Sequence, residues 1–282
     1  MHLVLHFLLT MLVGAPQPGP LHWNGKMAPG TTLRVLNVRG SIHVTPASGD
    51  MASVDGETTL GREGRHPVVL TVDSDAQTVT ICIYRKDIDH CSGGDLHGGH
   101  HYVDIDSDDD DGDHEGGHGA DVSVQLPKGV RVQVVSGNGR VDVTDAGSDV
   151  TASSGNGAVT VRGAGGRVTA SSGNGRVEVA TAAGPVSAST GNGAIDVRMD
   201  KLTDASSDMH FTTGNGTITV TLPASYAGDL DASTGHGEVT SDFPLHVIGR
   251  LSPEHVHAEI GAGGGARLRM ETGNGDLVLR KS

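Results

Sequence analysis

The sequence predicts an all-β fold, a single-stranded parallel β-helix or solenoid with coils of about 18 residues. Three observations lead to this class. A word of the form Ser/Thr-Gly-Asn-Gly recurs along the chain, and aliphatic residues two apart flank each copy. The 282 residues include 43 glycines but only one Trp, three Tyr and three Phe. Fixed-period repetition is typical of solenoids, in which each repeat contacts only its neighbours.

The repeated word predicts a corner between two strands. Its first glycine recurs at equal intervals at Gly137, Gly155, Gly173 and Gly191, and then after longer steps at Gly214, Gly235 and Gly273. The last step is close to two ordinary steps, which predicts a decayed copy near Pro253. In the sixth copy, Thr234-Gly235-His236-Gly237, histidine replaces asparagine. The residues predicted to form structural turns are Gly137, Asn138, Gly139, Gly155, Asn156, Gly157, Gly173, Asn174, Gly175, Gly191, Asn192, Gly193, Gly214, Asn215, Gly216, Gly273, Asn274 and Gly275.

The aliphatic spacing predicts two short strands per coil. Val141 and Val143 are followed, after the same gap in each coil, by Val150 and Ala152, and the pattern repeats through Ala188. A spacing of two places side chains on one face of a strand, so Val159 is predicted to point inward and Thr160 outward. The same rhythm appears upstream, at Leu33, Val35, Ile42, Val44, Val132 and Val134. Strands at 68–72 and 79–84 are expected to pair differently.

The corner word has two functional alternatives, a phosphate loop and a calcium-binding β-roll. A phosphate loop needs a helix after the glycines, whereas each copy here leads into another strand. A β-roll needs its acidic pattern at both corners, and the second corner lacks it. Glycine and asparagine both tolerate tight-corner backbone angles, and stacked asparagines can hydrogen-bond along a ladder. We therefore expect a structural corner.

The N-terminus predicts export. Residues 1–20 form an apolar leader, interpreted as a signal peptide with small residues at 13–15, although no Lys or Arg precedes the run. The alternatives are a misplaced start codon and an uncleaved tail. Cys82 and Cys91 predict one local disulfide in an exported protein, the alternative being two unpaired thiols. The expected location is the periplasm, the cell surface or the medium.

The formal net charge is −14, which argues against nucleic acid and anionic lipid as partners. A flexible insertion rich in Asp, His and Gly is predicted at residues 86–120, within a solenoid domain spanning residues 22–282. It contains His114-Glu115-Gly116-Gly117-His118, the zinc-protease word, but two adjacent glycines oppose the helix that this chemistry needs. The candidate ligands for a weakly bound divalent metal are His97, His100, His101, Asp109, Asp111, His114 and His118.

Outward positions of one strand in each coil carry hydroxyl groups, at Thr151, Ser153, Thr169, Ser171, Ser187 and Ser189. Such a flat face could bind an ordered lattice such as ice or glycan, whereas hydroxyls also suit any exposed strand.

The order of these features resembles the bacterial putative-adhesin family of β-strand-repeat envelope proteins. The similarity begins at Trp23 and Gly25, and it continues through LRVLNVRGSIHV, VTICIY and VSVQLPKGVRVQVVSGNG to SDFPLHVIGR and IGAGGGARLRMETGNGDLVLR. The resemblance implies an exported, non-enzymatic β-helix domain at the cell envelope and supplies no catalytic residues. The insertion at about 86–120 departs from the family pattern.

These observations favour a non-enzymatic extracytoplasmic β-solenoid that serves as a binding or structural surface. We expect no catalytic residues and no cofactor beyond a weakly bound metal. The partner is expected to be an envelope protein or a surface glycan, not nucleic acid, and no transmembrane anchor beyond the leader is expected. The alternatives are metal sequestration by the insertion and zinc-dependent hydrolysis at His114-Glu115-x-x-His118.

Overall fold

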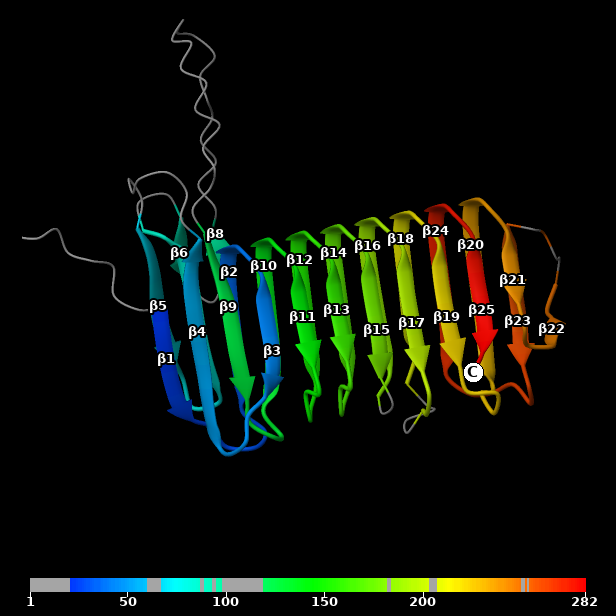
Figure 1. Ribbon diagram of the computed structural model, residues 1–282. Helices are drawn as coiled ribbons and strands as arrows, with labels where there is room; N and C mark the ends of the chain where they lie inside the picture. The colour runs from blue at the N-terminus through cyan, green and yellow to red at the C-terminus, as the bar shows by residue number, and fades with distance from the viewer. Residues whose placement is uncertain are drawn as a thin grey trace, which may run out of the picture.

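A computed structural model describes residues 21–59, 67–86, 89–92, 95–97, 119–181, 184–202, 207–249, 252 and 254–282. The leader and most of the predicted insertion lie outside these residues. The described chain is all-β and contains two large sheets and one small one. The small sheet pairs β7 (His90–Ser92) with β8 (Asp95–His97). Figure 1 shows the strands of the large sheets stacked side by side along one axis.

Sheet A has eleven strands, in the spatial order β1 (Leu21–Lys26), β4 (Met51–Thr59), β9 (Gly119–Leu126), β3 (Ile42–Pro46), β11 (Val141–Thr144), β13 (Val159–Arg162), β15 (Val177–Thr181), β17 (Ile195–Met199), β19 (Ile218–Leu222), β25 (Leu277–Lys281) and β21 (Val239–Ser241). Sheet B has twelve, in the order β22 (Leu245–Val247), β23 (His255–Ile260), β20 (Gly228–His236), β24 (Arg267–Asn274), β18 (Met209–Asn215), β16 (Val186–Asn192), β14 (Val168–Asn174), β12 (Val150–Asn156), β10 (Arg131–Asn138), β2 (Thr32–Arg39), β6 (Thr78–Arg85) and β5 (Val68–Ser74).

The central strands pair in parallel with the register that the sequence predicts. Val141 lies opposite Val159, and Val150 lies opposite Val168, so partners are one repeat apart in the sequence. Ile42 and Val44 pair with Val141 and Val143 in the same way, which confirms that the rhythm begins upstream. We use the word rung for two successive strands, one in each sheet, joined by a corner word. The rungs stack into a β-solenoid-like body.

The core lies between the two sheets and is built from small aliphatic side chains. Val159 and Val161 are fully buried, as are Val134 and Ala152. Such a core can be thin because Val and Ala fill only a narrow space between the sheets. Thr160 occupies the outward row that the alternation predicts, but it is only 7% exposed. It lies between Asp142 and Glu178 in the outer row, and these longer neighbours flank its short side chain.

Both ends of the stack depart from simple parallel stacking. At the N-terminal end, β4 pairs antiparallel with β9 and β1 with β4, while β5 pairs antiparallel with β6. These pairings confirm that strands near 68–72 and 79–84 pair differently. At the opposite end, β22 and β23 pair antiparallel, and β23 pairs antiparallel with β20.

The C-terminal rung occupies a position that chain order does not predict. Strand β24 lies between β18 and β20, and β25 lies between β19 and β21. The last rung in the sequence, β24 and β25, therefore lies between the rung of β18 and β19 and the rung of β20 and β21, although it follows both of them along the chain. The expectation of a decayed copy near residue 253 is wrong, because β22 and β23 account for the long step with antiparallel strands.

Candidate functional site

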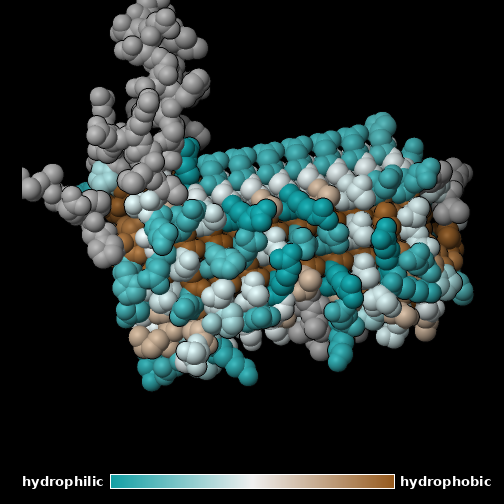
Figure 2. Space-filling view, in the orientation of Figure 1, coloured by the Kyte–Doolittle hydropathy of each residue, from teal (hydrophilic) through white to brown (hydrophobic). Residues whose placement is uncertain are grey.

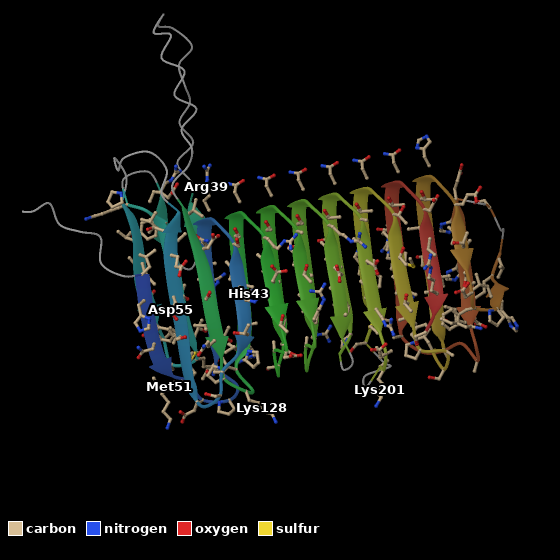
Figure 3. The ribbon with its side chains drawn as sticks, in the orientation of Figure 1. Arg39, His43, Met51, Asp55, Lys128 and Lys201 are labelled. Carbon is tan, nitrogen blue, oxygen red and sulfur yellow. A yellow bond between two sulfur atoms is a disulfide. The ribbon has the colours of Figure 1, made fainter. Side chains whose placement is uncertain are left out.

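The corner words line one long edge of the solenoid. In spatial order their central residues are Asn138, Asn156, Asn174, Asn192, Asn215, Asn274 and His236, and we call this row the corner ridge. Figure 3 shows the row of side chains along this edge, with Arg39 labelled at one end, and Figure 2 shows the same edge as a straight hydrophilic band. The side chains of the ridge are exposed.

The predicted hydrogen bonds between stacked asparagines are present along the ridge. Five of the six side-chain amides donate from Nδ2 to Oδ1 of the asparagine in the adjacent rung, Asn138 being the first acceptor. The five donor–acceptor distances are 2.8 Å from Asn156 to Asn138, 2.8 Å from Asn174 to Asn156, 2.9 Å from Asn192 to Asn174, 2.8 Å from Asn215 to Asn192 and 2.7 Å from Asn274 to Asn215. The inserted C-terminal rung continues this ladder without a break.

The first residue of each word has a role that sequence reasoning missed. Its hydroxyl is buried and donates to a glycine carbonyl of the adjacent rung, as Ser172 does to Gly157 at 2.8 Å. The other donors of this kind are Ser136, Ser154, Thr190, Thr213, Thr234 and Thr272. The available signal was that every copy of the word begins with a hydroxyl residue.

Close approach between rungs requires the glycines. A Cβ atom added to Gly155 would lie 2.4 Å from the carbonyl oxygen of Gly137. At Gly157, where φ is +155°, an added Cβ would lie 2.3 Å from the carbonyl oxygen of Gly139. Both positions therefore exclude any side chain, which explains why the word varies so little.

The outer surface of sheet B carries the predicted hydroxyl rows. Thr151 pairs with Thr169 and Ser153 with Ser171, and the rows continue to Ser187 and Ser189. All six side chains are at least partly exposed, and the Ser153 and Ser171 hydroxyls are hydrogen-bonded. We call these six residues the hydroxyl face. Their in-register spacing is about 4.8 Å between neighbouring strands.

A shallow hollow of about 220 Å³ lies at the edge of the hydroxyl face. Thr151 and Thr169 line it together with Arg131, Asp149 and Arg167. Neighbouring groups restrain its charged side chains. Arg131 donates to the carbonyl oxygen of Gly30, while the backbone N–H of Arg167 donates to Asp149 at 2.9 Å. The hollow is open, and its lining is mixed: Val132 and Val150 contribute apolar surface beside the charged and hydroxyl side chains.

A disulfide joins Cys82 to Cys91, across a sequence separation of nine. Within the loop that it closes, the buried carboxylate of Asp89 accepts a hydrogen bond from Nε of Arg85 at 2.9 Å. The disulfide and the ion pair connect Cys91 and Asp89 to two residues of β6, Cys82 and Arg85.

Almost all of the proposed metal ligands lie outside the described residues. His100, His101, Asp109, Asp111, His114 and His118 lie outside the described residues, and His97 is placed only as part of the backbone of β8. Within the described ranges, no group of three or more His, Cys, Asp or Glu residues could hold a metal ion. The part of the chain that the structure describes also contains no helix long and apolar enough to cross a membrane.

Comparison with known proteins gives low similarity throughout. No family model matches the chain, and no curated protein matches it. Two crystal structures align with it over most of its length. One is described as a putative cell adhesion protein from Clostridium sporogenes, with 12% identity, a TM-score of 0.33, and coverage of 94% of this chain and 100% of that one. The other is described as a putative adhesin from Bacteroides fragilis, with 10% identity, a TM-score of 0.38, and coverage of 95% and 99%.

Proposed function

We propose that the chain is an exported, non-enzymatic parallel β-helix, with coils of about 18 residues, that serves as a binding or structural surface at the cell envelope. The observation that carries this proposal is the hydroxyl face, a flat and polar surface in register over several rungs. Enzyme sites are usually deep, largely apolar pockets, whereas solenoids characteristically bind partners over extended surfaces. The open hollow beside the hydroxyl face is not a deep pocket and fits the second kind of site.

The disulfide between Cys82 and Cys91 supports export, because such bonds persist in oxidising compartments. Thiol labelling of the protein in its own cells tests this step. We expect both cysteines to resist labelling until a reductant is added, and the protein to fractionate with the envelope or the medium. Rapid labelling of both thiols in a cytoplasmic fraction would contradict the proposal.

The proposed partner is an envelope protein or a surface glycan. The test is binding of the full chain to isolated envelope polysaccharide and, separately, to envelope protein. A Thr151→Glu, Thr169→Glu double variant places two charges on the hydroxyl face. We expect it to lose at least about tenfold in affinity, which corresponds to roughly 1.4 kcal/mol.

The matched control is Thr219→Glu, Thr221→Glu, which changes the outer surface of sheet A, where both side chains are partly exposed. We expect this control to bind like the unmodified chain, with both variants melting close to it. Equal affinity of the hydroxyl-face variant and the control would contradict a binding role for that face.

A second candidate function is metal sequestration by the insertion at residues 86–120, favoured by its density of His and Asp side chains. Titration with Zn²⁺ or Ca²⁺ should show uptake that disappears when this segment is deleted while the rungs stay folded. The zinc-hydrolase alternative predicts instead tight, stoichiometric zinc and an activity that Glu115→Gln abolishes.

A further inference from the structure

The corner ridge contains a second, directional set of hydrogen bonds. The backbone N–H that follows each asparagine donates to the backbone carbonyl of the ridge residue in the next rung. The six bonds run from Gly139 to Asn156 at 3.0 Å, Gly157 to Asn174 at 3.1 Å, Gly175 to Asn192 at 3.0 Å, Gly193 to Asn215 at 2.9 Å, Gly216 to Asn274 at 2.8 Å and Gly275 to His236 at 2.8 Å. All of them point toward the same end of the stack.

These glycine N–H groups matter because asparagine followed by glycine is the dipeptide most prone to deamidation. In that reaction the glycine nitrogen loses its proton and attacks Cγ of the asparagine side chain. The new N–C bond closes a five-membered succinimide, and the side-chain nitrogen leaves as ammonia. Water then opens the ring to aspartate or isoaspartate. The attack requires a free glycine N–H and an asparagine side chain that can rotate toward it.

Stacking prevents both requirements inside the ridge. At Asn174, the nucleophile is the nitrogen of Gly175, whose proton is held by the carbonyl oxygen of Asn192. The side chain of Asn174 donates to Asn156 and accepts from Asn192, so it is fixed from both sides. Cyclisation at Asn174 would have to break the hydrogen bond of the Gly175 N–H and both side-chain hydrogen bonds of Asn174 at the same time.

The last position of the ridge lacks this protection. His236 belongs to the terminal rung, and no further corner lies beyond it in sheet order. Gly237 donates its N–H to no partner among the residues that the structure describes. This is also the one ridge position between Asn138 and the end of the stack that is not asparagine. Imidazole carries no acyl carbon and no leaving amine, so histidine cannot form a succinimide.

We propose that the six Asn-Gly corners are latent deamidation sites that rung stacking keeps unreactive, and that His236 occupies the one corner at which asparagine would react. The residue found at each of these corners then depends on whether another rung stacks beyond it. At the six Asn-Gly corners the next rung holds the glycine N–H and asparagine is used for the ladder, whereas the upstream corner, where Asn138 holds the N–H of Gly40, carries Arg39. Where no rung follows, a residue that cannot cyclise stands in place of asparagine.

The test is His236→Asn in the full chain, which restores the word found at the other corners. We expect position 236 to convert at least about tenfold faster than any of the six ridge asparagines, measured by peptide mass mapping during incubation at mildly alkaline pH. His236→Gln is the control, because its longer side chain cyclises far more slowly. The folded wild type should keep all six corners, and the same protein in urea should convert all six.

Hydrogen exchange of the wild type gives an independent measurement that does not depend on how the variant folds. The N–H of Gly237 should exchange rapidly, whereas those of Gly157, Gly175 and Gly193 should be protected. Conversion at position 236 as slow as at the six corners would overturn the proposal. So would folded wild type that deamidates at the rate seen in urea, or a Gly237 N–H as protected as the others.

Discussion

The hydroxyl group of Ser172 donates a hydrogen bond of 2.8 Å to the carbonyl oxygen of Gly157 in the adjacent rung. Ser172 is buried, so Ser172→Ala removes this hydrogen bond and leaves the carbonyl oxygen of Gly157 without that donor. We expect a loss of about 1 kcal/mol in the free energy of unfolding, measured by urea denaturation. Ser172→Thr should be close to neutral, because Thr190 and Thr213 make the same bond. Ser189→Ala, at an exposed position, is the control, and an equal loss there would contradict the role of the buried hydroxyl.

The alternation of the central strands predicts a large difference between neighbouring positions. Val159 is fully buried, and Val159→Asp would place an unpaired carboxylate in the aliphatic core. We expect a loss of several kcal/mol, roughly 3–5, in the free energy of unfolding. Thr144→Asp is the control, because Thr144 is partly exposed and lies opposite Arg162.

Thr160→Asp should fall between these two variants. Thr160 is buried, and the residues opposite it on the two adjacent strands are Asp142 and Glu178. A carboxylate at position 160 would therefore be shielded from solvent and repelled by two neighbouring negative charges. Small and equal effects of all three substitutions would contradict the inward orientation of Val159.

The repeat made the fold of the central strands predictable, because it leaves few ways to pair the strands of one coil with those of the next. A spacing of two between Val159 and Val161 defines an inward face, and identical words at a constant interval can stack only in register. The burial of Thr160 was not predictable, because the length of neighbouring side chains in a row, not the alternation, determines it. The role of Ser172 could have been suspected from the invariant hydroxyl at the start of each word.

The position of the C-terminal rung was beyond sequence reasoning for a different reason. Thr272-Gly273-Asn274-Gly275 pairs with the corner at Asn215 on one side and with the corner at His236 on the other. Words this similar offer nearly equal partners, so the pattern alone does not specify their spatial order. Antiparallel pairing of β23 with β20 closes the end of sheet B and leaves the inserted position for β24.

Deletion of residues 267–282 tests this inserted arrangement. Strand β20 contacts the stack through β24, and β21 contacts it through β25. Without those strands, residues 228–260 lose their attachment to the rungs. We therefore expect this segment to lose protection in hydrogen exchange and to be cleaved by proteases, while residues 131–199 stay protected. Continued protection of residues 228–260 would show that they stack directly on β18 and β19.

Tyr226 predicts a pH dependence at the same end of the molecule. Its hydroxyl donates to the carbonyl oxygen of Ala266 at 3.0 Å, just before β24, and its ring packs edge-on against Phe243. Burial, reinforced by the negative charges of Asp229 and Asp208, raises the pKa of Tyr226 to about 12 from an ordinary value of 10.0. The neutral phenol is therefore favoured in the folded state.

The stability that this neutral phenol provides is fully present below pH 10 and is lost as the pH rises toward 12, because the unfolded chain ionises first. We expect this group to account for about 2 kcal/mol of the loss across that window. Tyr226→Phe keeps the ring and removes both the titration and the hydrogen bond, so it should cost about 1 kcal/mol near neutral pH. It should then show a shallower decline above pH 10 than the wild type in urea denaturation, since all other groups titrate equally in both. Parallel declines for the two proteins would show that Tyr226 does not link the inserted rung to alkaline unfolding.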